Sequence, residues 1–203
     1  MGHDLIIRDL AVRHVGPLSL TVRAGECLGI SGPSGCGKSS LLRAVADLEA
    51  HEGQLFLGDL SSDAMSGPEW RRRVMLLPSE SAWWHDVVAD HFLEPESVNP
   101  EILGLTRAHM VMPVKRLSSG ERQRLALLRL LERKPQVLLL DEPTANLDAG
   151  STELAESLIL DYAGKTGAPV VWVAHDTEQL SRVSGRRMTM DSAGVFGSLE
   201  VAS

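Results

Sequence analysis

Residues 32–39 read Gly32-Pro33-Ser34-Gly35-Cys36-Gly37-Lys38-Ser39, and this stretch decides the fold. It is a complete G-x-x-x-x-G-K-[ST] phosphate-binding loop, or P-loop. A short apolar run over 26–30 precedes it and a helical pattern over 40–47 follows, which is the strand–loop–helix context that the motif requires. Glycines allow consecutive backbone N–H groups to turn toward one anion, and the positive end of the following helix points to the same place. The stretch therefore predicts a P-loop fold that binds a nucleoside triphosphate.

The loop also predicts roles for its side chains. We expect Lys38 to contact the β- and γ-phosphates and to take part in catalysis, and the Ser39 hydroxyl to be a ligand of Mg²⁺. Cys36 lies beside a lysine and a helix start, which favour a reactive thiol, whereas Cys27 is expected to be inert in its strand. The residues expected to bind the nucleotide here are Gly32, Pro33, Ser34, Gly35, Cys36, Gly37, Lys38, Ser39 and Ser40.

The composition limits what the chain does. With 203 residues, 43% of them hydrophobic, it can bury one full core, and no run approaches the roughly 18 apolar residues of a membrane span. We therefore expect a cytoplasmic protein. The net charge of −7 argues against a nucleic-acid partner, and Arg71-Arg72-Arg73 is interpreted as solvated surface. His85 and His91 could approach each other, but without a cysteine or acidic cluster we expect no zinc site.

Apolar runs alternate with helical patterns along the chain. The later runs, 137–140 and 170–173, are continuous, which is typical of parallel strands covered on both faces. Residues from about 80 to 116 lack strand character and predict a small inserted helical lobe, extending to about 130 with the next helix. The predicted fold class is thus α/β: a parallel core, an antiparallel β flap in the first half and this lobe, in one domain over 1–203. Strands are expected at 5–7, 18–22, 27–30, 55–57, 74–77, 137–140 and 170–173, and helices at 39–47, 121–133, 152–163 and 177–183.

Two carboxylates end the apolar run over 137–140. Ligands of doubly wound sheets bind at the carboxyl ends of the strands, so Asp141 is expected to face the Mg²⁺ of the P-loop. Glu142 is then placed to act as general base toward an attacking water, a role that is typically worth ~10²–10⁴-fold in rate. A second helix start lies at Ser118, which forms a capping box with Glu121 and is also a potential anion site.

Four motifs in register resemble the nucleotide-binding subunit of ATP-binding cassette (ABC) transporters, over residues 4–195. They are the P-loop, Leu-Ser-Ser-Gly-Glu at 117–121, Leu-Leu-Leu-Asp-Glu-Pro-Thr-Ala-Asn-Leu-Asp at 138–148 and Val-Ala-His-Asp at 173–176. The resemblance implies a RecA-like P-loop core, ATP with Mg²⁺, and a head-to-tail dimer of identical or different cassettes. ATP would lie between the P-loop of one subunit and the signature loop, residues 117–121, of the other.

The resemblance also implies site residues outside the P-loop. Ser118 and Gly120 would contact the γ-phosphate across the dimer interface, and Asp148 lies in the loop that crosses to the partner's site. His175 would hydrogen-bond the γ-phosphate and position the water of Glu142. A histidine at this place after a strand also has a purely structural interpretation.

Three positions depart from the family pattern. Ser119 stands where the signature usually has its first glycine, and its side chain is expected to slow closure of the dimer. His14 takes the place of the aromatic residue that stacks on adenine, so base stacking is expected at the low end of roughly 1–3 kcal/mol. Ser79 stands where a glutamine usually approaches Mg²⁺; a bridging water or Glu80 is the alternative.

Trp83 and Trp84 are adjacent in a chain with only 4% aromatic residues, so one of them is expected to be exposed. The resemblance implies that a transmembrane permease, a separate polypeptide, contacts this surface; the alternative is that the pair only seals the lobe. The leading hypothesis is thus the ATPase of a transporter, peripheral on the inner face of the cell membrane, with a faint similarity to metal- or iron-export cassettes. The alternatives are a cassette ATPase of DNA repair or chromosomes, and a small-molecule P-loop kinase.

Overall fold

The computed structural model describes residues 2–197 and 200–201; the other positions of the predicted 1–203 domain lie outside the described residues. The chain first forms an antiparallel sheet with the strand order β2-β1-β4-β5. β1 pairs with both neighbours, so that Ile7 lies opposite Leu20 on one side and Leu55 on the other. This confirms the antiparallel flap predicted for the first half. The strands are β1 (Leu5–Val12), β2 (Val15–Val22), β4 (Glu52–Leu57) and β5 (Leu60–Ser61).

The second sheet carries the parallel core, in the order β10-β9-β3-β8-β7-β6. Every residue of β7 and β8 is buried, as their continuous apolar runs predict. Ile30, Val173 and Asp141 lie side by side on β3, β8 and β7, so the carboxyl ends of these three strands meet at one edge. The strands are β3 (Cys27–Ser31), β6 (Val74–Leu77), β7 (Val137–Asp141), β8 (Val170–Val173), β9 (Arg186–Thr189) and β10 (Glu200–Val201).

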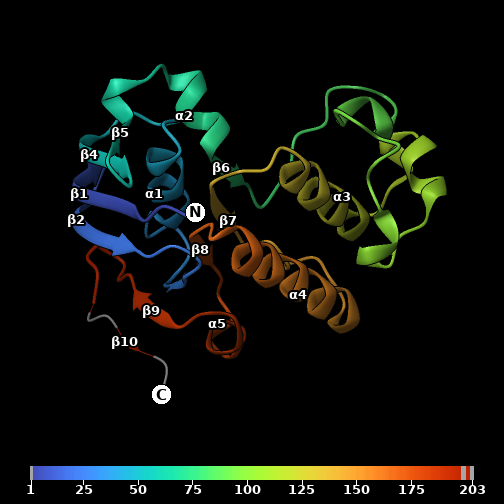
Figure 1. Cartoon of the computed structure of the whole chain (residues 1–203). Helices are drawn as coiled ribbons and strands as arrows, with labels where there is room; N and C mark the ends of the chain where they lie inside the picture. The colour runs from blue at the N-terminus through green and yellow to red at the C-terminus, as the bar shows by residue number, and fades with distance from the viewer. Residues whose placement is uncertain (1, 198–199, 202–203) are drawn as a thin grey trace.

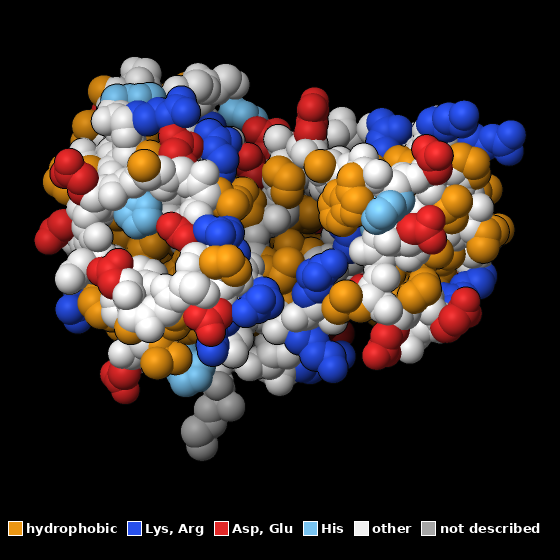
Figure 2. Space-filling model, turned by 90° about the horizontal axis from the view of Figure 1, so that it is seen from above, with side chains coloured by type: hydrophobic (Ala, Val, Ile, Leu, Met, Phe, Trp, Pro, Cys, Tyr) orange, Lys and Arg blue, Asp and Glu red, His pale blue; other side chains and the backbone are white. Residues whose placement is uncertain are grey.

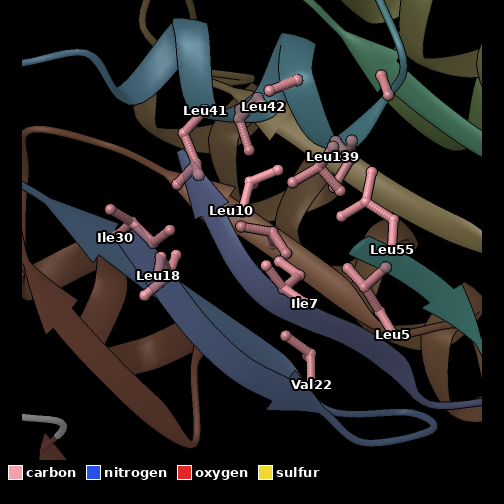
Figure 3. Packing of buried hydrophobic residues seen from close by; sticks show 14 of the residues in the cluster. Leu5, Ile7, Leu10, Leu18, Val22, Ile30, Leu41, Leu42, Leu55 and Leu139 are labelled. Atoms are coloured by element: carbon pink, nitrogen blue, oxygen red, sulfur yellow. The ribbon is translucent and has the colours of Figure 1, made fainter. Parts of the chain in front are cut away.

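Helix α1 (Lys38–Val45) joins the two sheets into one core (Figure 1). Leu41 and Leu42 of this helix pack against Leu10 of the flap and Leu139 of the parallel sheet (Figure 3). Their burial removes apolar surface from water, which is the main favourable term in folding. The P-loop, which immediately precedes α1, is thereby held at a fixed place beside the strand ends.

Helix α2 (Gly67–Arg73) was not predicted from the sequence. Trp70 anchors it: the indole is 1% exposed, and its Nε1 donates a hydrogen bond to the Val45 carbonyl at 2.9 Å. Arg71 pairs with Asp47 at 2.8 Å. The triple-arginine run therefore forms the last turn of α2, where positive charge near the carboxyl end of a helix is favourable. Arg72 is exposed, in keeping with the solvated surface that the sequence predicted.

The segment predicted as a helical lobe contains helical turns but, across residues 80–116, no α-helix. Its short 3-10 turns are η2 (Val88–His91), η3 (Pro100–Leu103), η4 (Arg107–Val111) and η5 (Val114–Arg116). They share a hydrophobic core with α3 (Ser119–Glu132), in which Leu103, Met110 and Leu125 are buried. The lobe thus depends on α3, beside which lies α4 (Ala149–Thr166) (Figure 1). Across the part of the chain that the structure describes, no helix is both long and apolar enough to cross a bilayer.

Candidate functional site

The P-loop connects β3 to α1 in a backbone conformation that requires glycine. Gly37, the N-cap of α1, has a φ of 108°, and a Cβ at this residue would lie 2.2 Å from Val15 Cγ2. Only glycine fits there. The residue also offers no side chain to cap the helix, so the first N–H groups of α1 remain available to an anion.

Lys38 folds back into the loop. It is 6% exposed, and its Nζ donates to the carbonyl oxygens of Gly32 at 2.7 Å and Pro33 at 2.9 Å. The ammonium group is thereby held at the start of α1, where the dipole also favours negative charge. The lysine charge therefore lies beside the loop that precedes α1.

The expectation of an accessible, reactive thiol at Cys36 is wrong. Its side chain is 1% exposed and belongs to the hydrophobic core, with Sγ 3.8 Å from Lys38 Nζ. A reagent needs access to the thiol, and packing against the core removes it. Cys27 is inert as expected, since burial, together with the charge of Glu26, raises the pKa of its thiol to about 12.

Glu142 and His175 meet in direct contact at the edge of the parallel sheet. Glu142 Oε1 lies 2.9 Å from His175 Nε2, and the side chains are 30% and 46% exposed. Glu142 has a φ of 50°, a conformation that few residues other than glycine adopt, and its N–H donates to the Val173 carbonyl at 2.9 Å. Backbone strain of this kind gathers at functional sites. The turn after β7 therefore directs the Glu142 carboxylate toward the end of β8.

A cavity of about 340 Å³ brings most of the predicted nucleotide-binding residues together. It extends from the P-loop, past His14, to Glu142 and His175. Ser79, which is exposed beyond the end of β6, does not line it. The residues that line it are Arg13, His14, Ser34, Gly35, Gly37, Lys38, Ser39, Ser40, Arg43, Glu142 and His175.

Two residues of this cavity were not predicted. Arg13 and Arg43 are held by the same carboxylate: Arg43 Nε lies 2.9 Å from Glu49 Oε2, and Arg13 pairs with the other oxygen. Burial alone would raise the pKa of Glu49, but hydrogen bonds from the two guanidinium groups outweigh it and lower the pKa. The three residues come from a turn of the β flap, from α1 and from the segment that follows α1, so no sequence spacing indicated their meeting.

The residues predicted to hold Mg²⁺ have the right chemistry. Asp141 is 6% exposed at the carboxyl end of β7, and Ser39 lies in the first turn of α1. Among the described residues, no group of three or more His, Cys, Asp or Glu side chains could hold a metal. One carboxylate and one hydroxyl nevertheless suit Mg²⁺, which usually takes few protein ligands and completes its shell with substrate phosphates and water.

The signature loop forms a separate surface of the chain. The predicted capping box is confirmed: Glu121 N–H donates to Ser118 Oγ at 3.2 Å, and Ser118 N–H donates to Glu121 Oε2 at 2.8 Å. The backbone hydrogen bond from Ser118 lowers the pKa of Glu121. A Cβ at Gly120 would lie 2.8 Å from the Asn146 carbonyl oxygen, so glycine allows the signature loop to touch the loop after β7.

Asp148 lies in that same loop and begins the next helix. Its Oδ1 accepts from Ser151 N–H at 2.9 Å as the N-cap of α4, and these hydrogen bonds lower the pKa of its carboxyl. Ser118, Gly120 and Asp148 therefore lie together, but they do not line the cavity that contains the P-loop of their own chain.

The two tryptophans lie where the core meets the lobe. Trp84 is 62% exposed and Trp83 is partly buried, as predicted. The Arg129 guanidinium carbon lies 4.5 Å from the Trp83 ring centroid and 4.9 Å from that of Trp84, within cation–π range. Hydrophobic and basic side chains gather between the two halves of the molecule on the face seen in Figure 2.

Comparisons with known proteins identify the family of this chain. The ABC transporter family matches residues 15–145. The trehalose/maltose import ATP-binding protein MalK of Thermococcus litoralis is 34% identical to this chain. The alignment covers 91% of this chain but only 55% of MalK. The probable iron export ATP-binding protein FetA of Escherichia coli is 32% identical over 81% of this chain and 79% of its own. This chain thus spans little more than half the length of MalK.

Solved structures show the same fold. The dimeric structure of MJ0796, a bacterial ABC transporter cassette, has a TM-score of 0.79 and 21% identity, covering 98% of this chain and 99% of that one. A post-hydrolysis dimer of the same cassette, bound to ADP and Pi, has a TM-score of 0.82 and 20% identity. Fold, motif geometry and family match lead to one conclusion: this chain belongs to the ABC transporter family and is an ATP-binding cassette protein.

Proposed function

We propose that this chain hydrolyses ATP to power a transporter, with Glu142 as general base. The observation that carries this proposal is the 2.9 Å contact between Glu142 and His175 in the same cavity as the P-loop. A structural carboxylate at a strand end would not need a strained backbone, a histidine partner and a place beside a triphosphate loop. Together these features fit in-line attack of water on a phosphoryl group.

The residues divide the reaction between them. Lys38 and the N–H groups of α1 bind the phosphates, and His14 stacks on the base. Glu142 accepts a proton from the water that attacks the γ-phosphorus, the bond from the γ-phosphorus to the bridging oxygen breaks, and ADP and phosphate result. Ser39 and Asp141 would hold Mg²⁺, which when bound neutralises phosphate charge. His175 orients the carboxylate and the water.

A second cassette would complete the site. Ser118 and Gly120 lie on a surface separate from the cavity of their own chain, so they can serve only the cavity of another copy. The dimeric form of the similar cassette MJ0796 supports this arrangement. Closure of two cassettes would exclude water and add a second helix start to each triphosphate.

The exposed surface around Trp84 is proposed to bind a transmembrane permease and so to keep the chain at the inner face of the membrane. Exposed aromatic residues beside arginine are typical anchors of protein interfaces. The cargo is not proposed, because the named relatives differ: one is named for trehalose/maltose import, another for probable iron export, and the sequence identities are similar.

Replacement of Glu142 by Gln tests the general base. Steady-state hydrolysis should fall by at least ~10²-fold, while equilibrium binding of ATP stays unchanged and the ATP-bound chain sediments as a dimer. The matched control is Glu153→Gln, which changes an exposed carboxylate on α4 and should hydrolyse ATP normally. Full turnover by Glu142→Gln would show that the base assignment is wrong.

Replacement of Trp84 by Ala tests the permease surface. Co-purification of a membrane protein with the tagged chain from detergent-solubilised membranes should decrease, because the exposed anchor is lost. Binding of ATP should not change, since Trp84 does not line the nucleotide cavity. Equal recovery of the membrane protein with both forms would contradict the proposed contact.

A further inference from the structure

A buried hydrogen-bond network connects the helix after His175 with the loop after Glu142. Gln179 on α5 (Thr177–Val183) is 6% exposed, and its Nε2 donates to Thr144 Oγ1 at 2.7 Å and to Glu156 Oε1 at 2.8 Å. Both amide hydrogens are therefore used. Thr144 and Glu156 are buried as well, at 7% and 8% exposure.

The connection is short in sequence on both sides. Thr144 lies two residues after Glu142, and Gln179 lies four residues after His175. One buried amide thus joins the two backbone segments that carry the candidate base and its histidine. We propose that Gln179 is a positioning residue for hydrolysis, which keeps the Glu142–His175 contact in place; this inference rests on the function proposed above.

A cavity beside the pair supports this assignment. About 300 Å³ of space adjoins Glu142 and His175, and the same cavity is lined by Thr144, Gln179 and Arg182. Because open space lies on this side of the pair, side-chain packing does not hold it there. Hydrogen bonds that cross from α5 to the loop after β7 take that role.

The network also contains a buried negative charge, the Glu156 carboxylate. The buried Glu156 carboxylate accepts from Gln179 and, at 3.0 Å, from Arg182, and buried carboxylates require such donors. The hydrogen bond with Glu156, together with the charge of that carboxylate, raises the pKa of Arg182. Glu156 on α4 therefore fixes the orientation of the Gln179 amide, and through it the distance between the two loops. A residue that only joined α4 to α5 would have no need to reach Thr144.

The experiment compares three variants in the full chain. Gln179→Leu removes both donors, Thr144→Val removes one acceptor at nearly constant shape, and the double variant Gln179→Glu with Glu156→Gln reverses donor and acceptor. For the first two, kcat for ATP should fall about tenfold or more and KM should stay within about twofold, because misplacement affects the reacting pair and not the P-loop. The double variant should recover most of kcat. Gln179→Glu alone should not, because its new carboxylate would face the carboxylate of Glu156.

Ser181→Ala is the matched control, because it removes a side-chain hydrogen bond of α5 to Thr177 without touching the network. Its kcat should equal that of the wild type. If Gln179→Leu and Thr144→Val keep normal kcat, or if they lose kcat and the double variant does not recover it, the proposal is overturned. Glu142→Gln is measured in parallel: normal turnover there would instead refute the base, independently of the network.

Discussion

At the scale of single residues, His91 shows how burial fixes a protonation state. The ring is 2% exposed, and its Nε2 accepts hydrogen bonds from the backbone N–H groups of Trp84 and His85, both at 2.9 Å. Nδ1 therefore carries the proton and lies 3.1 Å from the Val87 carbonyl oxygen. Burial is the main cause that lowers the pKa of His91, and the nearby Arg129 adds to it. The sequence predicted only that His85 and His91 could approach each other.

The folded chain should lose stability in mild acid because of His91. With its pKa lowered in the folded state, the unfolded chain binds more protons once the pH falls through ~6.5, so the free energy of unfolding decreases there. Thermal unfolding followed by tryptophan fluorescence at pH 7.5 and 5.5 measures the effect. The variant His91→Gln keeps a hydrogen-bond acceptor but does not titrate, so it should lose less stability than the wild type between pH 7.5 and 5.5. An equal loss of stability in both proteins would exclude His91 as the cause.

At the scale of elements, the starts of α3 and α4 show that residues which cap a helix also lie at the proposed site. Each helix begins at a side chain that accepts from its first turn, Ser118 in one and Asp148 in the other. Such caps are worth about 1 kcal/mol each. Both caps lie on the surface proposed to meet a second cassette, so residues that stabilise the helices are also those expected at the partner's triphosphate.

Two glycine-to-alanine changes in these helices should have opposite effects. Gly164 is exposed within α4, and a Cβ added there would meet no atom within 4 Å, so Gly164→Ala should stabilise the chain by roughly 0.5–1 kcal/mol. Gly120→Ala should destabilise it, because the new Cβ would lie 2.8 Å from the Asn146 carbonyl oxygen. Chemical denaturation of both variants checks the sign; destabilisation by Gly164→Ala would contradict the structure of α4.

At the scale of the whole molecule, the two halves of the proposed composite site lie on different surfaces of the chain. The cavity with Lys38 and Glu142 contains no residue of the signature loop. Under the proposed function, such a division makes catalysis depend on assembly, because neither surface would surround a triphosphate alone. Symmetric dimers then contain two equivalent composite sites.

Mixing two inactive variants tests this division. Lys38→Ala removes the P-loop charge, and Ser118→Phe blocks the signature surface, so each should be inactive alone. In an equimolar mixture, half of the dimers would carry one intact site of two, and roughly a quarter of wild-type hydrolysis should return. If the mixture stays as inactive as its components, the two halves do not act in trans.

The comparison of sequence and structure shows which helices and strands local sequence patterns can predict. β6, β8 and α5 have the predicted bounds, because apolar runs and a helix start at Asp176 are local signals. α2 was missed although Ser66 and Glu69 form a capping box at its start, because the helix is short and buries only Trp70, so it has no periodic apolar face. The lobe was predicted as helical, but its prolines and short runs allow only 3-10 turns before Ser119.

The sequence by itself determined the P-loop, the acidic strand end, the capping box at Ser118 and the family, since each is written in neighbouring residues whose spacing has a direct chemical meaning. Only the tertiary structure decided that Cys36 is buried, that Glu49 holds two arginines at the cavity, and that Gln179 joins the loops of Glu142 and His175. These facts depend on contacts between segments far apart in the chain, where burial and geometry, not residue order, set which groups meet.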